Sequence, residues 1–273
     1  MKYVNRYLLA AVAVLATPMF ASGQFRELDS APQAENEIET DRDSFTPAIT
    51  TVGIGNTQFE ASYSFIDNRR LPDAHSFPEA VLRRGIADRL ELRLGWNYAI
   101  GGPTSAVSGA DFGDEDFVVE RSSEIMYGLK LATSKQSGWL PTSSVIVEGY
   151  TPTSGPSNFS RFTLGEAFGW TLPNGWQWSS AMRFGTANEN GDNFNQWAPS
   201  TVVTVPLGKR WNVHAEYFGV MSDGKVVAQS QHYVSPGGHV HLTKNLELGL
   251  RFGFGLNTQT PTFFSNVGLG YRF

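Results

Sequence analysis

Apolar and polar side chains alternate at every second position over most of this sequence, and that period constrains the fold more than any other feature. In RLELRLGWNY, Leu90, Leu92, Leu94, Trp96 and Tyr98 share one face of an extended chain, while charged residues, glycine and asparagine share the other. The segment LELGLRFGFGL repeats this pattern. A helix has a period of about 3.6 residues and cannot separate the two sets in this way. Both segments therefore predict β-strands with one apolar face.

The same period predicts about twelve strands along the chain. They cover residues 55–66, 76–86, 89–99, 122–132, 142–152, 161–172, 176–185, 197–207, 211–221, 230–242, 246–257 and 262–273. Short links at 86–88, 134–141, 173–175, 208–210 and 243–245 alternate with longer polar links at 67–75, 100–121, 153–160, 186–196, 222–229 and 258–261. Short turns at one end and long loops at the other are typical of outer-membrane barrels. The sequence predicts an all-β fold, an antiparallel up-and-down transmembrane β-barrel of about 12 strands.

The tryptophans provide a second test of this fold. Trp96 and Trp197 lie beside long links, the other five lie at short turns, and none falls at the centre of a predicted strand. Amphipathic rings at both strand ends form the interfacial girdles of membrane barrels. A soluble β-sandwich would more often bury tryptophan between its sheets. Their positions therefore favour a membrane barrel.

The composition excludes several classes of function. The chain has no cysteine, which excludes a disulfide framework, thiolate catalysis and a cysteine metal site. Charged residues make up 17% of the sequence and the net charge is −5, with no basic block. We therefore expect no nucleic acid partner.

The N-terminal part divides into two segments before the barrel. Lys2 and Arg6 precede an apolar run and the small residues Ala21, Ser22 and Gly23, which predicts a signal peptide over residues 1–23. Residues 24–52 are polar and acidic, and we expect them to form a flexible periplasmic lead. The predicted barrel covers residues 53–273 in the bacterial outer membrane, with outer-membrane lipid as its surroundings.

The last strand, ending NVGLGYRF, places Val267, Leu269, Tyr271 and Phe273 on one face. Outward apolar residues that finish in an aromatic residue resemble the C-terminal signal by which outer-membrane proteins are recognised for insertion. We therefore expect Tyr271 and Phe273 to form this insertion signal, with the outer-membrane assembly machinery as a partner.

Several segments in order along the mature chain resemble one family. They are ETDRDSFTPAITTVGIGNTQFEASYSF, LRRGIADRLELRLGWNY, TPTSG, HAEYFG and NVGLGYRF. This series resembles the MetA-pathway of phenol degradation family of transporters. The resemblance implies an outer-membrane barrel that passes small compounds, aromatic or apolar ones among them. It does not identify any functional residue in this sequence. Asp43 and Ser44 stand where the family pattern has proline and an acidic residue, which leaves the role of the lead open.

The inward positions of the predicted strands carry charges of both signs. The expected lumen-lining residues are Arg83, Arg93, Glu124, Lys130, Glu148, Arg183, Glu216, Glu247, Arg251 and Arg272. They would form the polar wall of a pore, fill a narrow lumen by pairing across strands, or do both. Glu166 shares the face of Phe162 and Leu164, so it is expected to point toward lipid, where a charge is costly.

Two groups of residues could hold metal ions, but the sequence favours neither. His239 and His241 share a face, and His214 and Glu216 lie on a nearby inward face. Without a third fixed ligand, ordinary lumen residues are the favoured interpretation. The acidic links around Asp111–Asp116 and Glu189–Asp192 lack the spacing of an EF-hand, so solvated loops are favoured over a calcium site. We expect no cofactor and no metal.

The expected function is passive uptake of small solutes through an outer-membrane channel. The alternatives are a structural or adhesive barrel and an outer-membrane lipid hydrolase. The sequence has no G-x-S-x-G nucleophile elbow and no His-x-Ser pair on a predicted strand, so an enzyme is not expected.

Overall fold

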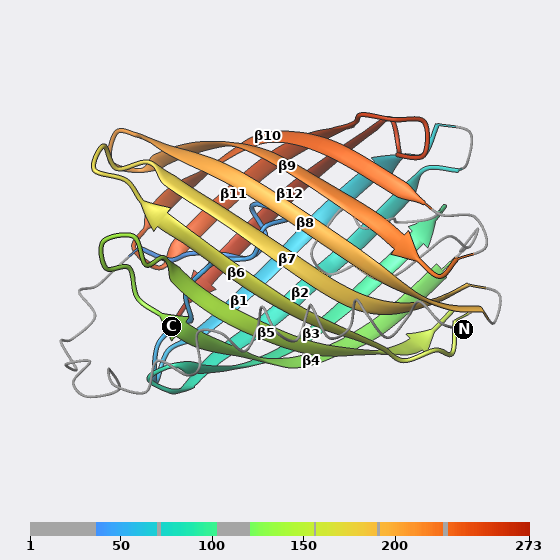
Figure 1. Cartoon of the computed structure of the whole chain (residues 1–273), viewed down its shortest axis with the longest axis horizontal. Helices are drawn as coiled ribbons and strands as arrows, with labels where there is room; N and C mark the ends of the chain where they lie inside the picture. The colour runs from blue at the N-terminus through green and yellow to red at the C-terminus, as the bar shows by residue number, and fades with distance from the viewer. Residues whose placement is uncertain (1–36, 70–71, 103–120, 156, 190–191, 226–228) are drawn as a thin grey trace. The chain divides into compact units, whose positions relative to one another are not determined.

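The computed structural model describes residues 37–69, 72–102, 121–155, 157–189, 192–225 and 229–273. These residues form a closed barrel of antiparallel strands (Figure 1). The strands are β1 Thr57–Asp67, β2 Ala74–Ala87, β3 Leu90–Gly101, β4 Arg121–Ser134, β5 Thr142–Ser154, β6 Arg161–Thr171, β7 Gln177–Glu189, β8 Asp192–Leu207, β9 Trp211–Asp223, β10 Ser230–Thr243, β11 Leu246–Gly255 and β12 Phe263–Arg272. The predicted fold class is therefore confirmed. Among these residues, no helix is long and apolar enough to cross a membrane.

The barrel closes where the first strand meets the last. β1 pairs antiparallel with β12, from Gln58 opposite Arg272 to Asp67 opposite Phe263. Two backbone hydrogen bonds between Thr57 and Phe273, of 2.9 and 3.1 Å, extend this ladder by one residue. Every other strand pairs with its neighbours in the chain. Closure leaves no edge strand, so the backbone groups of the wall are paired within it, as a bilayer requires.

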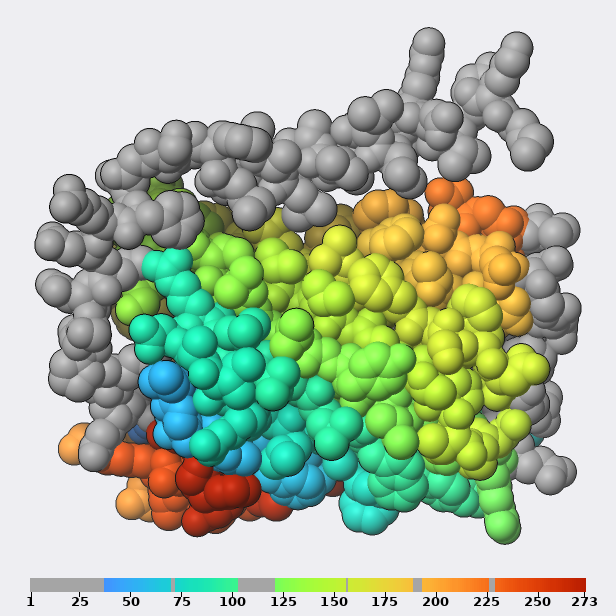
Figure 2. Space-filling view, turned by 90° about the horizontal axis from the view of Figure 1, so that it is seen from below, coloured from blue at the N-terminus to red at the C-terminus, as the bar shows by residue number. Residues whose placement is uncertain are grey.

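The two faces of the wall differ as the alternation predicts. Leu94 of β3 is 55% exposed, whereas Glu91 and Lys130 on the opposite face are fully buried. Figure 2 shows part of the outer wall, where side chains of β2 to β7 follow one another in chain order. A soluble protein would turn its polar face outward. Here the apolar face is outside, which suits lipid.

The links fall at two ends of the barrel. One end, which we call the turn end, has the links at 88–89, 135–141, 172–176, 208–210 and 244–245. The other, the loop end, has the links at 68–73, 102–120, 155–160, 190–191, 224–229 and 256–262. The prediction of a long loop over 186–196 is wrong, because β7 continues to Glu189 and β8 begins at Asp192. The polarity of this stretch predicted a loop, yet paired strands that extend past an apolar belt are polar too.

Residues Glu37–Val52 lie inside the barrel, and we call them the inner segment. Phe45 is 1% exposed, and Asp41 and Ile49 are also buried. This corrects the expectation of a flexible periplasmic lead for this part of residues 24–52. The remainder of that lead and the predicted signal peptide lie outside the described residues. The wall around the segment is polar, so polar residues of the segment can be buried against it. The low apolar content of this part of the chain therefore did not imply exposure to solvent.

The inner segment enters and leaves at the turn end. The N–H of Ile38 donates to the carbonyl of Lys244 in the β10–β11 turn, at 3.0 Å. After the segment, the N–H of Gly55 donates to the carbonyl of Gly85 near the end of β2, also at 3.0 Å. Between these points Phe45 packs against Phe218 of β9. The segment is therefore a loop that reaches into the lumen and returns.

Candidate functional site in the barrel lumen

The predicted lining residues lie on the inner side of the wall, with one exception. All of them except Arg272 have side chains buried on the inner face of the wall. Arg272 is partly exposed and donates to Asn245 Oδ1 and the Lys244 carbonyl at the turn end. It therefore lies at the rim, and the expectation that it lines the lumen is corrected.

Asp41 of the inner segment lies among three cations of the wall. Its Oδ2 is 2.6 Å from Arg93 Nη2, and its Oδ1 is 3.7 Å from Arg83 Nη1 and 3.6 Å from Lys130 Nζ. The same Oδ1 accepts a 2.8 Å hydrogen bond from the N–H of Ala48. One carboxylate thus ties the segment to β2, β3 and β4 and also folds it back on itself.

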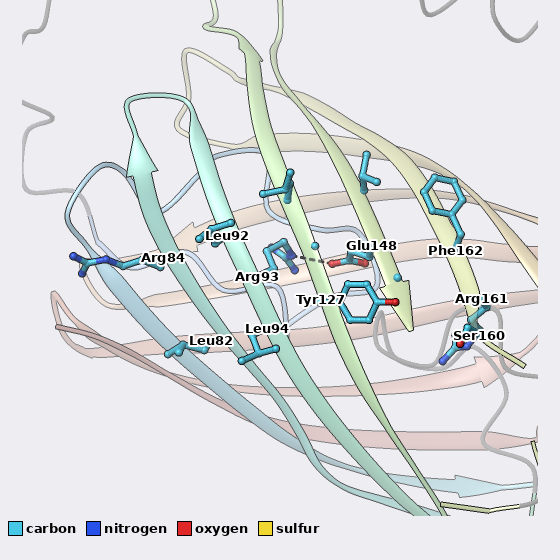
Figure 3. A pocket seen from close by; sticks show the side chains of 14 residues that line it. Leu82, Arg84, Leu92, Arg93, Leu94, Tyr127, Glu148, Ser160, Arg161 and Phe162 are labelled. Atoms are coloured by element: carbon cyan, nitrogen blue, oxygen red, sulfur yellow. Dashed lines mark hydrogen bonds and ion pairs between the residues drawn. The ribbon is translucent and has the colours of Figure 1, made fainter. Parts of the chain in front are cut away.

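The cations around Asp41 also pair with carboxylates of the wall. Arg83 Nε lies 2.8 Å from Glu91 Oε1, and Arg93 Nε lies 2.8 Å from Glu148 Oε1. Figure 3 shows the Arg93–Glu148 pair joining β3 to β5 past β4. Buried charges are tolerated only when paired in this way. This side of the lumen is therefore a continuous charge network.

Glu216 of β9 holds the tip of the inner segment. Its two carboxylate oxygens accept hydrogen bonds from the N–H groups of Phe45 and Thr46, at 2.9 and 2.7 Å, and from Thr46 Oγ1 at 2.7 Å. Arg183 donates to the carbonyl of Phe45 at 3.0 Å and lies over its ring, 4.0 Å from the centroid. Hydrogen bonds to a charged acceptor are stronger than neutral ones, so Glu216 is a principal anchor of the segment.

An aromatic cluster occupies the lumen toward the loop end. The rings of Phe45 and Phe218 are stacked at 4.2 Å, and those of Phe218 and Tyr233 at 4.6 Å. Phe264 and Ile66, both next to loop-end links, complete the buried cluster. Phe218, Tyr233 and Phe264 are not among the lumen residues predicted from the sequence. The signal was present, because Tyr233 shares the inward parity of Gln231, and Phe264 shares that of Asn266.

A small cavity lies beside the inner segment. A cavity of about 30 Å³ lies between the segment and β3 to β7, lined by Asp41, Phe45, Glu148, Tyr150 and Arg183 among others. That is about the volume of one water molecule. The buried inner segment narrows the lumen at this level.

A larger groove lies on the outer surface of the barrel. It has a volume of about 860 Å³ and crosses β2 to β6 (Figure 3). Outward-facing residues supply its apolar lining, which includes Leu82, Leu92, Leu94, Tyr127, Leu129, Val147 and Phe162. Gly128 also lines it and is the register partner of Arg93 and Glu148. Because this groove faces lipid, acyl chains can fill it, and we assign the functional site to the lumen.

Other residues singled out in the sequence have the following positions. His214, His239 and His241 are buried in the lumen near Asp43 and Glu247. Glu166 is partly exposed on the outer face, between Val145 and Met182 in the register. The acidic stretch around Asp111–Asp116 lies outside the described residues. Glu189 and Asp192 are register partners at the ends of β7 and β8.

Comparisons with known proteins agree with this architecture. The family model described as "Putative MetA-pathway of phenol degradation" matches residues 40–273, from within the inner segment to the end of β12. No curated protein matches the chain.

Two solved structures share the fold. The COG4313 outer membrane channel from Pseudomonas putida F1 is 12% identical, with a TM-score of 0.56 over 86% of this chain and 100% of that one. The NanC porin is 9% identical, with a TM-score of 0.53 over 78% of this chain and 97% of that one. At these identities the likeness concerns the fold, which is that of outer-membrane barrels. Together with the apolar outer face, it places the chain in the outer membrane.

Proposed function

Because the chain belongs to the MetA-pathway of phenol degradation family, we propose that it is an outer-membrane channel for passive uptake of small solutes, aromatic and apolar ones included. Of the two structures with the same fold, one is an outer membrane channel and the other a porin, which supports the channel. The choice of solute rests on the lumen itself.

The aromatic cluster is the observation that carries the proposed solute class. Phe218, Tyr233 and Phe264 present ring faces on the loop-end side of the lumen, next to Phe45 of the inner segment. Stacked and tilted ring contacts contribute about 0.5–1.5 kcal/mol each beyond area burial. A planar apolar solute that displaced Phe45 could form the same contacts with Phe218. A wholly charged lumen would offer no such surface.

Passage through the lumen requires the inner segment to move. The contacts that hold it are mainly ion pairs and hydrogen bonds, such as those of Asp41 and Glu216, and its apolar anchors are few. Each hydrogen bond to a charged group contributes about 1.5–3 kcal/mol net, and water can replace it when the segment moves. The strands pair with one another and not with the segment, so it can leave without unpairing the wall. The solute gradient would drive the transport.

We also propose that the chain has no catalytic activity. Glu91, Glu148 and Glu216 lie beside arginines and the inner segment. Carboxylates held in this way serve as structural anchors. A hydrolase would instead need a nucleophile with a base within hydrogen-bond reach.

Liposome swelling tests the channel and its solute class together. Phenylalanine and glutamine are similar in size, and both are zwitterions, so only the side chain differs. We expect folded, purified protein to admit phenylalanine faster than glutamine. Phe218→Ala should reduce this preference, and Phe252→Ala, on the outer face, should leave it unchanged. Flux of neither solute, with no conductance in planar bilayers, would favour the structural or adhesive barrel.

A further inference from the structure

Three side chains near the turn end form a compact group on the inner face of neighbouring strands. His239 and His241 lie two residues apart on β10, so both point into the lumen. Glu247 of β11 is the register partner of His241. All three side chains are buried. The hairpin itself therefore fixes their relative positions.

The Nε2 atoms of both histidines face the same carboxylate oxygen. His241 Nε2 lies 2.9 Å from Glu247 Oε2, and His239 Nε2 lies 4.0 Å from it. One ligand atom from each of the three residues fits within 4.8 Å of the others. Two ligands of a tetrahedral Zn²⁺ with bonds of about 2.0 Å are roughly 3.3 Å apart. The two separations bracket that value. His241 Nε2 also lies 3.1 Å from the carbonyl oxygen of Ile38, and this contact would have to give way to the metal.

Carboxylates of the inner segment lie on the other side of each ring. His239 Nδ1 is 2.8 Å from Asp43 Oδ2, and His241 Nδ1 is 3.4 Å from Glu37 Oε2. A metal-bound histidine usually donates its other ring N–H to a carboxylate, which fixes the tautomer with the metal-facing nitrogen free. The third residue has such support too, because Thr40 Oγ1 donates to Glu247 Oε1 at 2.6 Å.

The charge around Glu247 also favours a cation. Glu60, Glu91 and Glu148 each form an ion pair with an arginine of the wall. In the part of the chain that the structure describes, the ion pairs of Glu247 involve only His239 and His241. Two neutral imidazoles would leave this buried carboxylate without a counter-charge, which is costly. A divalent cation between the three side chains would supply it.

We propose that His239 Nε2, His241 Nε2 and Glu247 Oε2 bind one divalent transition-metal ion, with Zn²⁺ as the best match to two imidazoles and one carboxylate. Glu37 is about half exposed, at 54%, so the group lies close to solvent at the turn end. From the sequence alone no metal was expected, because no third fixed ligand could be identified. That ligand is Glu247, which only the pairing of β10 with β11 identifies.

A metal ion at this site would also stabilise the position of the inner segment. Asp43, Glu37 and Thr40 belong to the inner segment, and they hold the three ligands from behind. A bound ion would therefore link the segment to β10 and β11. This inference does not depend on the solute class, because it concerns the turn end and not the aromatic cluster.

Metal content and titration test the site directly. Full-length folded protein, purified with a histidine-free tag, is titrated with Zn²⁺ by calorimetry and then dialysed for metal analysis. We expect one equivalent of Zn²⁺ per chain. Titration with Co²⁺ should give the visible absorption of a low-symmetry site. The variant H239Q/H241Q should lose the equivalent, and Asp43→Asn should weaken binding by about 10–100-fold, as removal of such supporting groups does.

His232→Ala is the matched control, because His232 lies on the same strand but on the outer face, beside Tyr217. It should bind Zn²⁺ as the unmodified chain does. Heat-modifiable migration on gels shows that each variant is folded. If H239Q/H241Q bound Zn²⁺ as tightly as the unmodified chain, the site would be wrong. If the folded unmodified chain bound none, the histidines would act only as protonated partners of Glu247 and Asp43.

Discussion

Arg93 of β3 and Asp41 of the inner segment form a buried ion pair, with 2.6 Å between Nη2 and Oδ2. Arg93 is also bound to Glu91 and Glu148 of the wall, so the pair joins the segment to a network that exists without it. The segment can therefore leave without stranding Arg93 as an unpaired charge.

Asp41→Asn should loosen the inner segment and change the charge of the lumen. Lys130 and two arginines would lose a shared anion, so conductance should rise and ion preference should shift toward anions. Planar-bilayer recordings with a salt gradient measure both quantities. Asp88→Asn, in the exposed β2–β3 turn, is the control and should behave as the unmodified chain. An unchanged reversal potential for Asp41→Asn would contradict the prediction.

Glu216→Gln should release the tip of the segment. The amide keeps the shape of the carboxylate but loses its charge, and a hydrogen bond to a charged group contributes about 1.5–3 kcal/mol against about 1 for a neutral one. We expect the open fraction in single-channel records to increase at least several-fold. The same change at Glu166, on the outer face, should have no such effect. Equal gating in the two variants would argue against an anchoring role for Glu216.

The orientation of the barrel can be tested because the chain has no cysteine of its own. A cysteine at Thr258, in the exposed β11–β12 link of the loop end, should react with an impermeant thiol reagent on intact cells. A cysteine at Asn174, in the exposed β6–β7 turn, should react only after the outer membrane is opened. Equal labelling of both positions on intact cells would refute this orientation.

Deletion of Phe273 should impair closure and insertion. It removes both backbone bonds to Thr57 and the ring that lies 5.8 Å from Tyr271. We expect loss of heat-modifiable migration and less protein in the outer membrane. Leu256→Ala, at an exposed apolar position near the other end of the wall, should insert normally. Unimpaired folding of the deletion variant would remove the support for Tyr271 and Phe273 as an insertion signal.

Much of the wall could be predicted from the sequence, because alternation reports which face a side chain takes. The strand expected over 142–152 is Thr142–Ser154, and the one expected over 211–221 is Trp211–Asp223. The same parity assigns Arg93 and Glu216 to the inner face, and both side chains are buried. It could not give their partners, since register and the path of the inner segment bring together residues far apart in the chain, such as Asp41 and Lys130.

Polarity alone misled the sequence analysis in two places. The stretch ETDRDS has the composition of a solvated tail, yet a polar lumen accepts the same residues and pairs them. The stretch over 186–196 has the composition of a loop but continues two paired strands. In both places the structure depends on pairing: the inner segment pairs with residues of the wall that are far away in the chain, and β7 pairs with β8. Composition does not encode either pairing.

The entry and exit of the inner segment at one end determine how it can move. A segment that crossed the barrel from end to end would have to be threaded out before the lumen opened. This one can swing out toward the turn end and back, because only residues 53–56 separate it from β1. A tether that short keeps the local concentration of the segment near its site in the millimolar range. If the segment gates the channel as proposed, closure would be a fast intramolecular rebinding, and each opening would be brief unless a solute or another ligand occupied the vacated contacts.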